Sequence, residues 1–230
     1  MAYSWILVDA DGTLFDYDLA EAAALRESLA DVEVECTSEV IGTYRTINTS
    51  VWRAFERGEI TQAELRTKRF EDLFESLNVR RDAAEFSRLY LDRLSRQAQL
   101  IGDAESVIRT LRTEARLVLL TNGLAEVQRP RLARSALRGL FDAVVISEEV
   151  GAAKPDRRIF DICFEHMGRP RREEVLMVGD SLTSDIRGGI EYGIDTCWFN
   201  PAHVINESEL HPRYEIAALS ELVPILMGSR

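Results

Sequence analysis

Cysteine is scarce in this 230-residue chain, and the few cysteines are not spaced like metal ligands or a redox pair. Cys36, Cys163 and Cys197 are odd in number and far apart, and they form no CxxC motif. We therefore expect neither a disulfide framework nor a structural zinc site. A reducing cytoplasm is the expected compartment.

Long apolar runs and an excess of positive charge are also missing. The N-terminal segment has no basic residue before the short apolar run Trp5–Val8, which predicts neither a signal peptide nor a membrane span. The chain has 28 Lys and Arg against 39 Asp and Glu, a net charge of −11. Nucleic acids and anionic membranes need basic patches on their partners, so neither is expected as a partner.

What the chain does have is a set of short apolar runs, which predict strands buried on both faces. Amphipathic helical patterns separate most of them, and this alternation indicates an α/β fold with a parallel sheet and right-handed crossovers. The runs are Trp5–Val8, Arg116–Leu120, Ala143–Ile146, Val175–Val178 and Thr196–Phe199. Residues Tyr214–Met227 are expected to add a short strand and a closing helix with Ser220 as its N-cap.

The segment between the first two runs has a different character, with almost no β-branched stretches. It predicts four amphipathic helices, and Thr61 with Glu64 forms a capping-box pattern at the start of the third. The expected helices are Leu19–Leu29, Ser38–Arg57, Gln62–Leu77 and Ala83–Leu94. We therefore predict a core domain made of residues 1–14 and 96–230, interrupted by a helical domain at 15–95.

Polar residues collect directly after the predicted strands, at the edge where open parallel sheets bind ligands. They are Asp9 and Asp11, then Thr121 and Asn122, then Lys154, then Asp180 and Asp185. Asp9 and Asp11 point the same way on a strand, so their charges repel unless a cation lies between them. A plain turn is the alternative for this pair, and a helix N-terminal acid is the alternative for Asp185.

Four carboxylates form an all-oxygen ligand set, which favours Mg²⁺ over zinc or copper. The predicted metal ligands are Asp9, Asp11, Asp180 and Asp185. The set fits phosphoryl transfer, with Asp9 as the nucleophile and Asp11 as the proton donor to the leaving group. Thr121, Asn122 and Lys154 are expected to hold the phosphoryl oxygens, and Lys154 supplies the fixed cation that an acidic chain needs.

These stretches, taken in order, resemble the motifs of the haloacid dehalogenase (HAD) superfamily of phosphohydrolases. The motifs are Asp9-Ala-Asp-Gly-Thr-Leu, Thr121, Lys154 and Gly179–Asp185. The resemblance implies a Rossmann-like parallel-sheet core with an inserted all-helical cap domain, an aspartyl-phosphate intermediate and Mg²⁺. Within the superfamily the chain is most similar to the YjjG-type pyrimidine 5′-nucleotidases. Gly12 replaces a Glu of that group, at a loop position where no effect on the chemistry is expected.

The nucleotidase resemblance implies that the substrate is a small phosphate monoester such as UMP, dUMP or dTMP. Arg45, Asn48 and Trp52 are spaced i, i+3 and i+7 on one helical face, and they are the predicted contacts to the base. Packing of Trp52 in the core of the helical domain is the alternative for that ring.

Three other functions remain open at this stage. A phosphatase or phosphomutase for sugar phosphates would keep all four motifs. A haloacid dehalogenase would leave Asp11 without a task, because its leaving group needs no proton. A binding protein without catalysis would be expected to have lost one of Asp9, Asp11, Lys154 or Asp180, and none is missing.

Overall fold

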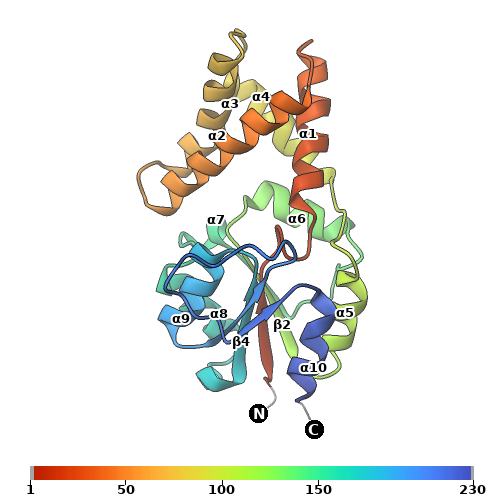
Figure 1. The fold of residues 1–230 in the computed structure, drawn as a ribbon, viewed down its shortest axis with the longest axis vertical. Coiled ribbons are helices and arrows are strands. Elements are labelled where there is room, and N and C mark those ends of the chain that lie inside the picture. The colour runs from red at the N-terminus through yellow and green to blue at the C-terminus, as the bar shows by residue number, and fades with distance from the viewer. Residues whose placement is uncertain (1–2, 229–230) are drawn as a thin grey trace. The chain divides into compact units, whose positions relative to one another are not determined.

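The computed structural model describes residues 3–228 and divides them into two compact units. Residues 3–17 and 98–228 form the first unit, and Asp18–Gln97 form the second. The first is an α/β domain around a parallel sheet, and the second is all-helical (Figure 1). The predicted fold class is confirmed. The predicted division after residues 14 and 95 lies close to these limits.

Six parallel strands form the sheet in the order β3-β2-β1-β4-β5-β6. The strands are β1 (Trp5–Val8), β2 (Arg116–Thr121), β3 (Ala143–Ile146), β4 (Val175–Gly179), β5 (Asp195–Phe199) and β6 (Tyr214–Ile216). β1 is paired on both sides, so that Val8 lies in register with Leu119 of β2 and Val178 of β4. The carboxyl ends of β2, β1 and β4 therefore lie next to one another at the same edge of the sheet.

Alternating residues of β1 pack into two separate apolar cores, as a strand buried on both faces requires. Ile6 and Val8 belong to one core, and Trp5 and Leu7 belong to the other. Helices cover both faces of the sheet (Figure 1). They are α5 (Ala104–Leu111), α6 (Ala125–Arg134), α7 (Ser147–Val150), α8 (Arg157–His166), α9 (Arg187–Tyr192) and α10 (Leu222–Met227).

The second unit contains the helices that the sequence predicts, with small shifts at their ends. They are α1 (Tyr17–Asp31), α2 (Ser38–Glu56), α3 (Gln62–Ser76) and α4 (Ala83–Arg96). The capping box at α3 is confirmed, because Thr61 Oγ1 accepts from Glu64 N and Glu64 Oε2 accepts from Thr61 N. Stacked and edge-to-face aromatic rings, including Tyr44, Phe70 and Tyr90, fill the centre of this unit.

One predicted cap is wrong. β6 and α10 form as expected, but Ser220 lies inside a 3₁₀ turn, Leu219–Glu221, that precedes α10. The carboxylate of Glu221 accepts from the backbone N–H groups of Ala217 and Ala218 at 2.9 and 2.8 Å. These bonds start the turn one residue before Ser220, so the hydroxyl has no capping role.

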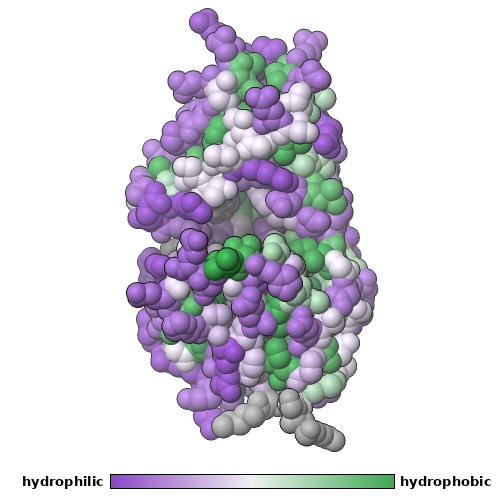
Figure 2. Space-filling model, in the orientation of Figure 1, coloured by the Kyte–Doolittle hydropathy of each residue, from purple (hydrophilic) through white to green (hydrophobic). Residues whose placement is uncertain are grey.

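The visible face of the molecule is mostly hydrophilic, with apolar residues in small groups (Figure 2). Within residues 3–228, no helix combines the length and the apolar character that crossing a membrane requires.

Candidate active site

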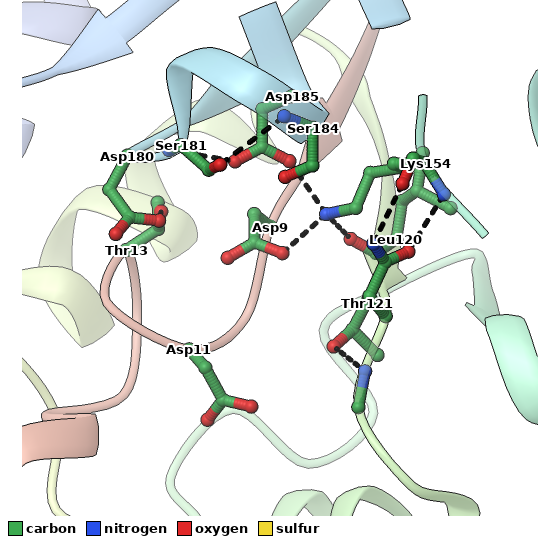
Figure 3. Close-up of polar contacts among 12 residues, drawn as sticks. Asp9, Asp11, Thr13, Leu120, Thr121, Lys154, Asp180, Ser181, Ser184 and Asp185 are labelled. Atoms are coloured by element: carbon green, nitrogen blue, oxygen red, sulfur yellow. Dashed lines mark hydrogen bonds and ion pairs between the residues drawn. The ribbon is translucent and has the colours of Figure 1, made fainter. Parts of the chain in front are cut away.

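Three neighbouring strands bring the predicted polar residues together (Figure 3). Asp9 follows the central strand β1, Thr121 ends β2, and Asp180 follows β4. Lys154 comes from the connection between α7 and α8, and Asp185 lies in the π-helical turn Leu182–Ile186 after β4. The local backbone thus aims side chains from four separate stretches of sequence at the end of β1.

Asp9, Asp180 and Asp185 form a cluster in which one carboxylate oxygen of each lies within 4.8 Å of the others. Asp9 and Asp185 are buried. The Asp11 carboxylate lies outside this cluster and points away from it (Figure 3). The structure therefore brings together three of the four predicted metal ligands, and the Asp11 side chain as a fourth ligand stays a prediction.

Lys154 is the buried cation of this cluster, with a relative exposed area of 1%. Its Nζ donates to Asp9 Oδ1 at 2.5 Å, to Asp185 Oδ1 at 2.6 Å and to the Leu120 carbonyl at 2.8 Å. Burial alone would lower the pKa of Lys154, but the charges of Asp185 and Asp9 outweigh burial and raise it. The charged ammonium form of Lys154 is therefore favoured in this site.

Asn122 holds the backbone of Lys154 from both sides. Its Oδ1 accepts from Lys154 N at 2.8 Å, and its Nδ2 donates to Lys154 O at 2.9 Å. The side chain predicted to bind substrate thus fixes the segment that carries the buried cation. Thr121 Oγ1 accepts from Gly123 N at 3.0 Å, which shapes the loop after β2.

One lysine does not neutralise three carboxylates, and the pKa values of Asp9 and Asp180 are both raised. Burial, opposed by Lys154 and assisted by Asp185 and Asp180, raises the pKa of Asp9 well above its usual range. Burial of the carboxyl group and then the charge of Asp185 raise the pKa of Asp180 to about 7, although part of the residue is exposed to solvent. Burial is thus the main cause of the raised pKa values, and the repulsion between the carboxylates adds to an effect that Lys154 offsets only in part.

A divalent cation fits this site. The three side chains offer only carboxylate oxygens, the ligand type that Mg²⁺ prefers. A cation between them would supply the missing positive charge. The neighbouring groups also fix the position of Asp180, because Thr13 Oγ1 donates to its Oδ1 at 3.3 Å and Trp198 Nε1 donates to its carbonyl at 2.8 Å.

Gly12 lies against this cluster. Its φ is +81°, and a Cβ placed on it would lie 2.4 Å from Asp180 Oδ2. The expectation that residue 12 has no bearing on the chemistry is therefore not supported by the geometry. Any side chain there would have to displace Asp180.

Asp11 has two partners that the motif analysis missed. Gln128 Nε2 donates to its Oδ2, and Arg131 Nη1 donates to its Oδ1. Both partners lie on α6, three residues apart and on its buried face. The signal that could have revealed them is an arginine and a glutamine on a helix face that should be apolar.

The predicted base contacts all lie in the second unit. Asn48 is buried, and its Nδ2 donates to Glu21 Oε1 at 2.9 Å. Arg45 donates to Glu21 Oε2 at 3.1 Å and to the Asp18 carbonyl at 2.9 Å. Trp52 is partly buried, with its ring centroid 5.9 Å from that of Phe55. Their contact with a base stays a prediction.

Two relatives of known name match nearly the whole chain. The pyrimidine 5′-nucleotidase YjjG of Escherichia coli (strain K12) is 37% identical over 226 residues, which cover 98% of this chain and 99% of the relative. The pyrimidine 5′-nucleotidase PynA of Streptococcus pneumoniae (strain ATCC BAA-255 / R6) is 34% identical over 227 residues, with 98% and 96% covered.

A solved structure is similar over the same extent. The crystal structure of YfnB from Bacillus subtilis bound to magnesium matches with a TM-score of 0.94 at 38% identity, and it covers 98% of this chain and 99% of that chain. The family model of the haloacid dehalogenase-like hydrolases matches residues 3–193. With the motifs, the fold and the acidic cluster in agreement with these matches, the chain belongs to the haloacid dehalogenase-like hydrolase family.

Proposed function

We propose that this protein is a Mg²⁺-dependent phosphatase that hydrolyses pyrimidine nucleoside 5′-monophosphates through an aspartyl phosphate on Asp9. The observation that carries the proposal is the convergence of Asp9, Asp180 and Asp185 around the end of β1, with Lys154 bonded to two of them. The choice of substrate is supported by the names of the relatives YjjG and PynA. The choice of metal is supported by the magnesium bound in YfnB.

Asp9, Asp180 and Asp185 would hold the Mg²⁺, whereas the Asp11 carboxylate of the predicted ligand set lies outside their cluster. When bound, the ion neutralises phosphoryl charge, so that a carboxylate can approach an anionic phosphorus centre. Lys154 acts with it as a fixed positive charge, bonded to the Asp9 carboxylate before any substrate arrives. This pairing orients Asp9 and opposes the rise in its pKa that burial causes.

The first half-reaction transfers the phosphoryl group to the protein. A carboxylate oxygen of Asp9 forms a bond to phosphorus while the bond from phosphorus to the nucleoside oxygen breaks. The protonated Asp11 gives its proton to that leaving oxygen, which departs as the 5′-hydroxyl. Thr121 is the predicted contact to the equatorial phosphoryl oxygens, where charge spreads in the transition state, and Lys154 supplies a fixed positive charge beside them.

The second half-reaction returns the enzyme to its starting state. Water attacks the phosphorus of the aspartyl phosphate, and its proton passes to the Asp11 carboxylate. The bond between phosphorus and the Asp9 oxygen then breaks, and inorganic phosphate leaves. Asp11 is thereby protonated for the next turnover, so atoms and charges balance over the cycle.

The decisive experiment is a phosphate-release screen with Mg²⁺ against UMP, dUMP, dTMP and sugar phosphates. We expect release from the pyrimidine nucleotides, its loss with a chelator and its return with added Mg²⁺. Asp9→Asn should abolish turnover in a protein that stays folded. Turnover near the normal rate in Asp9→Asn, or without any metal, would contradict the mechanism.

The same screen separates the alternative activities within the family. Preference for a sugar phosphate with release of free phosphate would indicate a phosphatase of another substrate class. Transfer of the phosphate within a sugar, without release, would indicate a phosphomutase. A dehalogenase is disfavoured because a halide leaves without a proton and would give Asp11 no task. Asp11 is nevertheless present, and two buried side chains hold it.

A further inference from the structure

Helix α6 holds both oxygens of the Asp11 carboxylate. Gln128 donates to one oxygen and Arg131 donates to the other. The two donors are three residues apart in sequence, so they lie on the same face of the helix. Asp11 therefore has a defined side-chain position, although it lies in a loop.

Folding stability alone does not explain why Arg131 is buried. The Arg131 side chain has no exposed area, whereas 24% of the Asp11 side chain is exposed. Its guanidinium stacks over Phe15 at 5.4 Å, but Nε and Nη2 have no hydrogen-bond partner within residues 3–228. A buried cation with unmet donors costs stability, and replacing such pairs by apolar residues is often stabilising. The presence of Arg131 in the core is therefore better explained by a role in function than by stability.

The loop after β2 is shaped to admit Gln128. A Cβ on Gly123 would lie 2.3 Å from Gln128 Nε2 and 2.9 Å from its Cγ. The space that the missing side chain leaves is occupied by the Gln128 amide. Gly123, in the loop after β2, thus leaves room for the Gln128 side chain to reach Asp11.

From these contacts we propose that Gln128 and Arg131 are positioning residues for Asp11 in the proposed phosphatase reaction. They hold its carboxylate apart from the cluster of Asp9, Asp180 and Asp185. In an in-line displacement the leaving oxygen lies across phosphorus from the nucleophile, so its proton donor must stay away from Asp9. Without Arg131, the Asp11 carboxylate keeps only its hydrogen bond from Gln128 and is free to turn towards Asp9, which lies two residues before it.

The role is tested by the dependence of the rate on the leaving group. UMP needs its alkoxide protonated, whereas p-nitrophenolate departs without help, so positioning of the acid matters for only one of them. We expect Arg131→Met and Gln128→Met to lower kcat/KM for UMP about 10- to 100-fold and that for p-nitrophenyl phosphate less than about 3-fold. The parameter kcat/KM reports the first half-reaction, in which Asp11 is the acid.

Two further variants exclude a general effect on folding. Arg129→Met makes the same change on the same helix at an exposed ion pair with Glu149, and we expect both rates to stay normal. Arg131→Lys keeps the buried charge and should recover part of the UMP rate. This variant also serves if Arg131→Met does not fold.

A double-mutant cycle supplies the second criterion. If Arg131 acts through Asp11, Arg131→Met should have no further effect on kcat/KM in an Asp11→Asn background. Equal losses on both esters, or independent effects in the cycle, would overturn the positioning role while the phosphatase function stands. A wild type that releases phosphate from neither ester would overturn the proposed function, and the positioning role would fall with it.

Discussion

Lys154 is an unusual choice of cation for this chain. Only two of its 28 basic residues are lysines, Lys68 and Lys154, and all the others are arginines. At Lys154 the three acceptors surround a single nitrogen at 2.5 to 2.8 Å. A compact ammonium with three donors fits such a site, whereas the planar fork of arginine does not.

This geometry predicts that charge alone does not replace Lys154. Lys154→Arg should lower kcat/KM for p-nitrophenyl phosphate at least about 100-fold, because the larger guanidinium overfills a buried site and displaces Asp9. Lys154→Met should in addition lower the free energy of unfolding by about 3 kcal/mol, since it leaves buried carboxylates without their partner. Steady-state kinetics and urea denaturation measure the two effects.

The matched control is Lys68→Met. Lys68 pairs with Asp72 on the surface of α3, with about half of its side chain exposed. Its replacement should change stability by less than about 0.5 kcal/mol and leave the rate unchanged. A Lys154→Arg protein with a normal rate would show that the site needs only a positive charge.

The cysteines predict a simple test of the native fold. Burial raises the pKa of Cys163 and of Cys197 to about 12, whereas Cys36 is partly exposed. Since the thiolate is the reactive form, we expect one thiol per chain to react with a disulfide reagent at pH 8, and three after denaturation. Rapid reaction of two or three thiols in the native protein would contradict the burial of the two core cysteines.

At the scale of elements, the strands β1 to β5 could be predicted from the sequence because each contains a short apolar run that is followed by polar residues. Asp9, Asp180 and Lys154 follow from those ends and from motif order. The contacts of α6 could not be predicted, because Gln128 and Arg131 lie more than a hundred residues from Asp11. Only the packing of α6 beside the first loop brings them together.

Asn122 shows a second limit of sequence patterns. Its place after β2 indicates a substrate contact, yet its amide is bonded to the backbone of Lys154 on both sides. A strand-end position gives the location of a side chain but not its partner. The partner depends on how the loop that carries Lys154 packs against the loop after β2.

The turn after β1 carries a prediction for residue 12. Gly12→Ala places a Cβ where Asp180 Oδ2 now lies, so Asp180 must move away from the metal cluster. We expect the Mg²⁺ concentration for half-maximal activity to rise about tenfold or more, as found when groups that orient metal ligands are altered. A Mg²⁺ titration of the rate measures the change.

Gly139→Ala is the control for backbone strain. Gly139 has a similar φ of +74°, and no atom lies within 4 Å of the position of its Cβ. Both variants should lose about 1 kcal/mol of stability from the left-handed backbone. Only Gly12→Ala should change the Mg²⁺ response. Equal Mg²⁺ titrations for the two would show that the contact with Asp180 has no functional consequence.

For the whole molecule, the net charge of −11 affects how a charged substrate approaches the site. An acidic protein repels an anionic substrate, so positive charge must be concentrated at the site. The core unit places two buried cations at the site, Lys154 beside Asp9 and Asp185, and Arg131 beside Asp11, which offset only part of the negative charge there. At the cluster, Asp9, Asp180 and Asp185 outnumber Lys154, so a further positive charge is needed there.

That need predicts how Mg²⁺ stabilises the protein. A ligand that binds only the folded state adds stability of RT ln(1 + [L]/Kd), about 2.7 kcal/mol at one hundred times Kd. For a unit of this size we expect Tm to rise by several degrees with saturating Mg²⁺. Asp180→Asn should remove most of this rise, because it takes one of three ligands from the cluster.

The control must separate this site from the acidic surface, because 39 carboxylates attract Mg²⁺ without a specific site. Asp92→Asn makes the same charge change at an exposed residue of α4 that pairs with Arg96. It should leave the Mg²⁺-dependent rise in Tm intact. If Asp92→Asn and Asp180→Asn reduce the rise equally, Mg²⁺ acts through the overall charge and the cluster at the end of β1 does not bind it specifically.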